Sequence, residues 1–442
     1  MPSNYTSQNP NTDVREGGPD RPPRISAQHW RLAIVAGMAS YLDSGLLISG
    51  GISLAIWKSH YGIDALQLGI VSATLTFCVA LGAFFGGRLA DMLGRRLVFN
   101  VDILIYVIGA VMIVFAPDVY WLTAGVAIAG LAAGADLPTS VAVVSELAPK
   151  GASGRMVALT QVMWSVGILV AVAIGFACSS MGILGVQLLF AHLAIVGLAT
   201  WAVRVFSPSF RRMEEQAVAS NEDADAAQAL PLRKLLGSST YIRAIVLTCL
   251  FYVAWNLMAN TIGQFKAFYL VTVNGASQAL ATALMVPTNV LAVFGGLMFV
   301  RLIDTKYRRT VFYIGAVGQI VAMCIAALSG GTALLPMIIC FIVYSAFHPF
   351  AGEAMYKVWT QESFPVNARA TVQGLTYSVS RLVCAAVAVF TPMIVEANPA
   401  ALLWLLVGCA VMAALVGSLI IGTGKGRPET RDTKVSGTPV TH

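Results

Sequence analysis

The sequence predicts an all-α membrane protein with twelve transmembrane helices in two bundles of six. Only 11% of its 442 residues are Asp, Glu, Lys or Arg, whereas water-soluble proteins carry about 25%. Hydrophobic residues make up 57% of the chain and fall into long runs separated by short polar segments. A bilayer core requires roughly 20 apolar residues per helix. The strands of a transmembrane β-barrel would alternate in polarity, so this class is excluded.

Each expected helix is an apolar run bounded by polar residues. The runs lie near residues 30–57, 66–86, 97–116, 120–146, 156–178, 183–205, 242–270, 277–300, 311–329, 333–357, 370–393 and 400–422.

Polar segments divide the chain into five regions. The longest internal one contains several acidic residues and separates two halves of six runs each. The N-terminal segment lacks the apolar stretch of a cleaved signal peptide, so we expect a disordered tail there. The expected regions are a cytoplasmic tail (1–28), a first bundle (29–205), a cytoplasmic linker (206–241), a second bundle (242–422) and a cytoplasmic C-terminal tail (423–442).

Basic residues predict the orientation. They concentrate in the loops at 87–96, 147–155, 206–241, 301–310 and 358–369 and are scarce in the alternate loops. The positive-inside rule therefore places these loops and both termini in the cytoplasm, and we expect a bacterial inner (plasma) membrane.

Several classes of function are disfavoured. The net charge of +7 is spread over short loops and does not form a basic patch with aromatics, so no nucleic-acid partner is expected. The seven cysteines lie inside apolar runs without close pairs, which indicates neither a disulfide nor a metal site. No nucleophile or phosphate-binding motif is present. We therefore expect neither an enzyme nor a bound cofactor.

The two halves repeat one another. The segment RLADMLGRRLVF at 88–99 matches RLIDTKYRRTVF at 301–312, and Glu146 with Pro149 matches Glu362 with Pro365. Such a repeat of six-helix units is the architecture of alternating-access transporters, which bind substrate near mid-membrane between the halves.

The repeated loop motif resembles the signature of the major facilitator superfamily, with a degenerate second copy in the matching place. This resemblance implies the major facilitator fold and a cytoplasmic gate in which acidic groups and arginines form charge-assisted hydrogen bonds. The residues implied in gating are Gly87, Asp91, Gly94, Arg95, Arg96, Glu146, Arg155, Asp304, Arg308, Arg309, Glu362 and Arg369.

A finer resemblance points to the sugar porters and related metabolite:proton symporters. Tyr41, Asp43 and Gly45 resemble part of their first-helix motif, and Gln161 with Gly167 matches a fifth-helix pattern whose glutamine binds sugar hydroxyls. Two departures matter. The tandem glutamines of the seventh helix are absent, and the segment around Asp136 is more similar to phosphate:proton symporters.

Acidic residues inside the membrane are candidate proton carriers. A charge at a membrane helix centre costs roughly 2.5–3.5 kcal/mol, so each one requires a role or a partner. Asp43 and Asp136 lie inside expected helices one and four, and burial favours the neutral form of such groups. Glu353 takes the corresponding place in helix ten. It is either a third proton-coupling residue or the partner of Lys357 in an i,i+4 ion pair.

Among the basic residues inside expected helices, Lys266 and Arg381 are candidates for binding or pairing. Lys266 lies about one turn from the outer end of helix seven, where it either extends to the interface or faces the cavity as an anion contact or the partner of an acid. Arg381 is deeper in helix eleven and is expected to be paired.

Polar and aromatic residues on the central helices fit a small hydroxylated solute. Amides donate and accept hydrogen bonds, and flat rings stack on sugars and cyclitols. The expected substrate-binding residues are Gln161, Trp164, Trp255, Asn256, Asn260, Gln264, Lys266, Asn289, Tyr344, Gln373, Tyr377 and Arg381.

Three functions remain open from the sequence. The first is import of a sugar, polyol or cyclitol by proton symport, and the second is symport of a small organic anion or phosphate. Efflux of drugs or metabolites ranks third, because residues 161–178 lack the proline typical of antiporters. The expected partners are the solute, protons and membrane lipid, with the chain working as a monomer.

Overall fold

The computed structural model describes residues 26–93, 95–147, 153–206, 237–303, 305–364 and 366–425. All regular secondary structure in these ranges is helical. Ten helices are long and apolar enough to cross a membrane, and Val162–Ala177 and Leu334–Phe347 are shorter apolar helical segments among the described residues. The predicted class, an all-α membrane protein, is confirmed.

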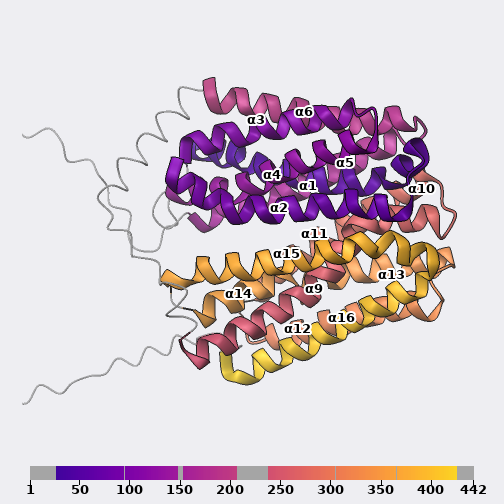
Figure 1. The fold of residues 1–442 in the computed structure, drawn as a ribbon. Helices are drawn as coiled ribbons and strands as arrows, with labels where there is room; N and C mark the ends of the chain where they lie inside the picture. Colours follow the sequence, from indigo (N-terminus) through magenta and orange to yellow (C-terminus); the bar gives the residue numbers. More distant parts are fainter. Residues whose placement is uncertain are drawn as a thin grey trace, which may run out of the picture.

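The first half of the chain forms a bundle of antiparallel helices (Figure 1). Ser26 caps the first helix by accepting a hydrogen bond from the backbone of His29, and Gly62 ends it with a φ of 61° that favours glycine. The helices described in this bundle are α1 (Ala27–Tyr61), α2 (Ala65–Leu93), α3 (Arg95–Val114), α4 (Val119–Leu147), α5 (Ser153–Ala177) and α6 (Ile183–Phe206).

The second half repeats this arrangement with two interrupted helices. Its described elements are α9 (Ser239–Thr272), α10 (Gln278–Ala283), α11 (Met285–Leu302), α12 (Arg308–Leu328), α13 (Leu334–Phe347), α14 (Glu353–Ser363), α15 (Val366–Ala397), α16 (Pro399–Ile420) and a final π-helical turn, η1 (Ile421–Lys425).

Neither of these two interruptions was predicted from the sequence. Prolines explain both of them. The expected helix 277–300 is divided into α10 and α11, and the expected helix 333–357 into α13 and α14. The ring of Pro287 would clash with the carbonyl of Ala283, the last residue of α10. α13 ends at Phe347, and Pro349 has no backbone N–H with which to continue the helical hydrogen bonds beyond this point.

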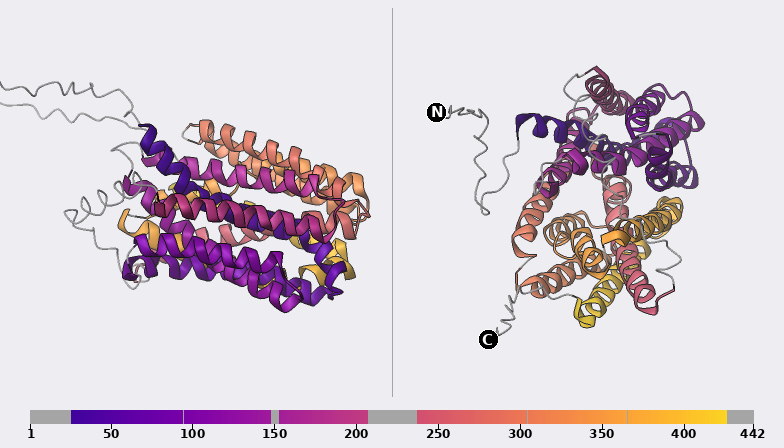
Figure 2. Two further views of the ribbon diagram at one scale, coloured as in Figure 1. Left: turned by 90° about the horizontal axis from the view of Figure 1, so that it is seen from above. Right: turned by 90° about the vertical axis from the view of Figure 1, so that its left-hand side faces the viewer.

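The two bundles lie side by side (Figure 2). We call the end where α1 begins and α16 ends the terminal end, and the opposite end the distal end. Helices α1 and α2 of the first bundle pack against α9 and α15 of the second. These four helices therefore form much of the boundary between the bundles.

The outer surface of the bundles is apolar. Ile195, Phe294 and Leu415 expose 67%, 66% and 62% of their surfaces, although all three are strongly hydrophobic. Inside, Trp57 stacks on Phe190 at a ring distance of 5.6 Å. Apolar side chains on both faces of the helices fit a protein surrounded by lipid.

Candidate functional site

Asp43 lies near the middle of α1, at the boundary between the two bundles. The residue is 3% exposed, and its Oδ2 atom has no hydrogen-bond partner. The neighbouring Ser44 donates a hydrogen bond to the carbonyl of Trp164 on α5, at 2.8 Å. Gly167 allows this close approach, because a Cβ there would lie 2.4 Å from the carbonyl oxygen of Tyr41. Tight packing of α1 on α5 therefore fixes the position of Asp43.

Arg381 faces Asp43 from the middle of α15, in the other bundle. Its guanidinium is 8% exposed and lies within range of a direct charge interaction with Asp43. In the part of the chain that the structure describes, the two groups are not joined by an ion pair within 4.0 Å. Arg381 instead donates a hydrogen bond of 2.6 Å to the Tyr377 hydroxyl, and its Nε atom has no partner. The site therefore holds opposite charges that face each other without a direct bond.

Glu353 and Lys357 form the expected i,i+4 ion pair at 2.8 Å, at the start of α14. Both side chains remain accessible, with 38% and 44% of their surfaces exposed. Glu353 also lies within electrostatic range of Asp43 and Arg381. The ion-pair interpretation is confirmed, whereas the proton-coupling role of Glu353 stays a prediction.

Aromatic rings of the second bundle form a continuous wall beside these charges. Tyr252 stacks on Tyr356 at 4.1 Å, on Tyr377 at 5.8 Å and on Trp255 at 6.0 Å. The indole of Trp255 then stacks on His348 at 6.4 Å. Three elements, α9, α14 and α15, and the turn after α13 contribute these rings. Aromatic faces of this kind pack well against the apolar faces of sugar rings.

Two buried donors along this wall lack a partner. The Nε1 atom of Trp255 and the hydroxyl of Tyr344 are both buried without a hydrogen bond. Tyr344 stacks on His348 at 5.3 Å, so it extends the same wall along α13. Buried donors are rarely left unpaired, and a bound solute would satisfy them.

The predicted amides serve different purposes. Asn256 on α9 donates to the Ser380 hydroxyl at 2.9 Å, beside Arg381. Gln264 crosses the bundle boundary to the carbonyl of Ser72, at 3.0 Å. Asn289 bonds within its own helix, to the carbonyl of Met285. Asn256 therefore belongs to the central site, whereas Gln264 joins the bundles and Asn289 has a local partner.

The remaining predicted amides and one tryptophan differ in how far they are exposed. Asn260 is buried on α9, while Gln373 and Trp164 are partly exposed on α15 and α5. The side chain of Gln161 lies outside what the structure describes.

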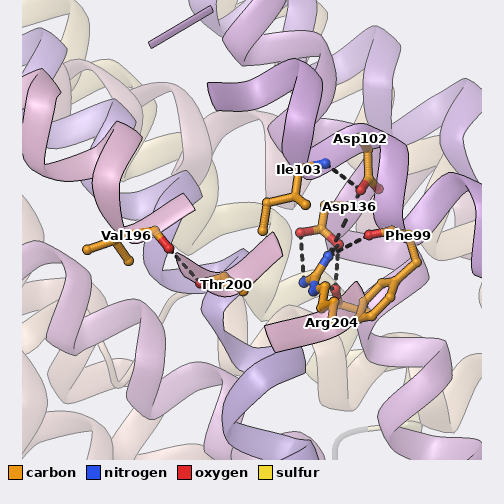
Figure 3. Close-up of polar contacts among 8 residues, drawn as sticks. Phe99, Asp102, Ile103, Asp136, Val196, Thr200 and Arg204 are labelled. Atoms are coloured by element: carbon orange, nitrogen blue, oxygen red, sulfur yellow. Dashed lines mark hydrogen bonds and ion pairs between the residues drawn. The ribbon is translucent and has the colours of Figure 1, made fainter. Parts of the chain in front are cut away.

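Asp136 is paired inside the first bundle, so it has the partner that an acid in a membrane helix requires when it has no other role. Both of its oxygens accept hydrogen bonds from Arg204 of α6, at 3.1 Å, and Ser140 donates a further one at 2.6 Å (Figure 3). The carboxylate of Asp102 on α3 lies 4.0 Å from the same guanidinium. All three charged side chains are almost fully buried. Asp136 therefore belongs to a cluster with Asp102 and Arg204, and its proton-coupling role stays a prediction.

Sequence reasoning missed Arg204. It stands in the last turn of α6, inside the expected helix 183–205 and outside the basic loops used to predict the orientation. A count of the charges inside the first bundle would have indicated that a cation was missing. Asp102 and Asp136 are two acids inside one bundle, and they require a cation that reaches inward.

Lys266 is buried, so of its two interpretations the inward-facing one agrees with the structure and extension to the membrane interface does not. It is 8% exposed, and its ammonium donates a hydrogen bond of 2.9 Å to the hydroxyl of Thr288 on α11. It also lies 5.5 Å from the ring centre of Phe341. The side chain therefore points into the second bundle and not along the helix to its end.

Of the predicted gating residues, the structure brings Arg308 and Glu362 together. Both terminal nitrogens of Arg308 donate to one oxygen of Glu362 at 2.7 Å, which joins the start of α12 to the end of α14. Arg309 is partly exposed. Of the other predicted gating residues the structure describes at most the backbone, and they are Gly87, Asp91, Gly94, Arg95, Arg96, Glu146, Arg155, Asp304 and Arg369.

Several direct contacts join the two bundles at or toward the distal end. Lys58 of the first bundle forms an ion pair with Glu396 of the second. Gln278 donates to the carbonyl of Ile52 at 2.8 Å. Gly69 allows α2 to touch α15, because a Cβ there would lie 1.9 Å from the carbonyl oxygen of Val389. The distal end is therefore closed in this structure.

Comparison with known proteins gives matches along almost the whole chain. A family model described as "Sugar (and other) transporter" matches residues 32–429. The minor myo-inositol transporter IolF of Bacillus subtilis (strain 168) is 30% identical over 403 residues, which cover 89% of this chain and 91% of that protein. The glucose transporter GlcP of Staphylococcus epidermidis (strain ATCC 12228 / FDA PCI 1200) is 23% identical, with coverage of 90% and 93%.

A solved structure has the same fold. The crystal structure of a D-xylose-proton symporter matches with a TM-score of 0.69 at 18% identity, covering 88% of this chain and 96% of that one. The expected major facilitator fold of two six-helix bundles is confirmed.

Proposed function

The chain belongs to the sugar (and other) transporter family, and we propose that it imports a small hydroxylated solute together with protons. It is a membrane transporter and not an enzyme. A sugar, polyol or cyclitol is the proposed solute. The names of similar proteins support this proposal, because they refer to myo-inositol, glucose and D-xylose with protons.

One observation carries the proton-coupling proposal: Asp43 is buried and faces Arg381 across the bundle boundary. When Asp43 is ionised, its attraction to Arg381 holds the two bundles together at mid-height. When Asp43 binds a proton, this attraction is lost and the bundles can change their relative orientation. Protonation of one buried carboxyl group thereby biases a change between two states of the transporter.

Asp136 and Glu353 are given secondary roles in this proposal. Each already has a basic partner, Arg204 and Lys357 respectively. Protonation of either residue would break an ion pair within one bundle and would leave the contact between the bundles unchanged. Asp43 has no such direct partner among the described residues, and it therefore takes the main role.

The proposed solute lies between Asp43 and the aromatic wall of the second bundle. Trp255 and Tyr344 offer the unpaired donors, and Tyr377 and Asn256 stand next to Arg381. Trp164 and Gln161 of α5 would contact the solute from the first bundle. Arg308 and Glu362, with the other predicted gating residues, would latch the terminal end when the distal end opens.

We also propose an orientation. The basic loops face the terminal end, so that end lies in the cytoplasm of a bacterial inner membrane and the distal end faces outward. The chain is proposed to work as a monomer surrounded by lipid, because both bundles that flank the proposed solute site come from one chain.

Uptake by the purified protein in liposomes tests the proposal. External pH is followed while sugars, polyols, cyclitols and the acids derived from them are added in turn. We expect alkalinisation with at least one of them, together with its loss in Asp43→Asn and retention of solute exchange without protons. Asp118→Asn is the matched control, because Asp118 is exposed and only caps the start of α4 through Trp121. Undiminished proton uptake in Asp43→Asn would exclude Asp43 as the carrier.

A further inference from the structure

Lys266 differs from the other buried cations in its surroundings. Arg204 is paired with Asp136, Arg308 with Glu362, and Arg381 faces Asp43. For Lys266, the described part of the chain provides no carboxylate within 4.0 Å. Its one hydrogen bond is to the neutral hydroxyl of Thr288. An ammonium group in a membrane helix without a counter-charge is costly, so a structure that keeps one implies a partner from outside the chain.

The groups near Lys266 include the Thr288 hydroxyl, an aromatic ring and a thiol. Phe341 lies under the ammonium at 5.5 Å. The thiol of Cys340 is within electrostatic range of both Lys266 and Tyr344, whose buried hydroxyl has no partner. Trp255, with its unpaired Nε1, lies eleven positions before Lys266 and hence on the same face of α9. This side of the second bundle therefore presents a positive charge and free donors, which suit an anionic ligand.

We propose that Lys266, with Thr288, binds a carboxylate on the transported solute. The inference rests on the proposed function and narrows its substrate class to hydroxylated monocarboxylates, such as acids derived from sugars or cyclitols. The hydroxylated part would lie along Trp255 and Tyr344, whose free donors it satisfies. In this structure, in which the distal end is closed, the Thr288 hydroxyl accepts a hydrogen bond from the Lys266 ammonium. When the site opens, the carboxylate of the solute would accept this hydrogen bond instead.

This assignment has an electrical consequence. A neutral solute carried with one proton moves one positive charge across the membrane, whereas a monoanion carried with one proton moves none. Transport of the proposed substrate should therefore depend on the pH gradient and respond little to an imposed membrane potential. This measurement separates an anionic from a neutral substrate without reference to any variant.

The experiment uses the full chain in liposomes and two matched pairs of probes. D-glucose with D-glucuronate, and D-glucitol with D-gluconate, differ only by a CH₂OH group in place of a carboxylate. We expect proton-coupled uptake of at least one acid at a rate that an imposed potential does not change. In Lys266→Met this uptake should fall by at least about tenfold, as expected when a charge-assisted hydrogen bond is removed. Lys266→Arg should retain more of the uptake.

The control is Lys306→Met, which removes an exposed lysine outside the site and should leave uptake of the acid unchanged. Thermal unfolding of each variant shows whether it is folded. Proton-coupled, potential-driven uptake of the neutral probes alone, unchanged in Lys266→Met, would overturn this inference and leave the proposed function intact. The absence of proton movement with all four probes would overturn both.

Discussion

Arg204 binds both oxygens of Asp136 in the interior of the first bundle, through two hydrogen bonds of 3.1 Å. The same guanidinium packs over the ring of Phe99 at 3.5 Å and donates to the carbonyl of that residue. Asp102 stands 4.0 Å away. One cation thereby joins α3, α4 and α6 in the buried interior of the first bundle.

Loss of Arg204 should destabilise the first bundle. Arg204→Gln leaves Asp102 and Asp136 buried without a cation, and breaking a buried pair in this way costs about 3–5 kcal/mol. We expect a clear fall in the melting temperature of the purified protein, with a smaller fall for Arg204→Lys, which cannot bind both oxygens in the same way. The exposed Arg243 provides the control variant Arg243→Gln. Equal melting temperatures for Arg204→Gln and this control would contradict the prediction.

Arg381 should be required for accumulation of the solute. In Arg381→Gln the ionised Asp43 has no facing cation, and a lone charge in a membrane helix costs roughly 2.5–3.5 kcal/mol. Proton-driven accumulation in liposomes should therefore fall by about one to two orders of magnitude. The double variant Asp43→Asn/Arg381→Gln should be no worse than Arg381→Gln alone. Additive losses in the double variant would show that the two residues act independently.

Gly69 should be essential for closure of the distal end. Gly69→Ala places a Cβ 1.9 Å from the carbonyl oxygen of Val389, so α2 and α15 must separate there. We expect loss of uptake and a longer distance between spin labels at Asp64 and Asn398, both in distal turns. The control is Gly263→Ala, because a Cβ there meets no atom within 4 Å. An unchanged label distance in Gly69→Ala would count against the closed contact.

The ion pair between Lys58 and Glu396 should bias the same closure weakly. Both side chains are about one third exposed, at 30% and 32%, and such pairs contribute only about 0–1 kcal/mol. Lys58→Glu should favour the distal-open state by a few-fold in the spin-label populations. The exchanged variant Lys58→Glu/Glu396→Lys should restore the original populations, and 1 M salt should remove the difference by screening. An effect that persists in high salt would require another cause.

The sequence by itself determined the membrane class, the repeated halves and the helical runs, because these depend on local composition. A run of about 20 apolar residues crosses a bilayer whatever its neighbours are. The i,i+4 pair of Glu353 and Lys357 is equally local, since helical geometry alone brings the two residues together. The choice of Asp43 as a candidate proton carrier also followed from its depth in the first run.

Only the tertiary structure decided which charges meet. Arg204 and Asp136 are 68 positions apart, and Asp43 and Arg381 come from different bundles. Contacts of this kind depend on how the helices pack, which helical periodicity does not specify. The same holds for Lys266, whose burial against Thr288 follows from the position of α11 beside α9. Local sequence therefore fixes which residues enter the membrane, whereas packing between helices decides which of them find a partner.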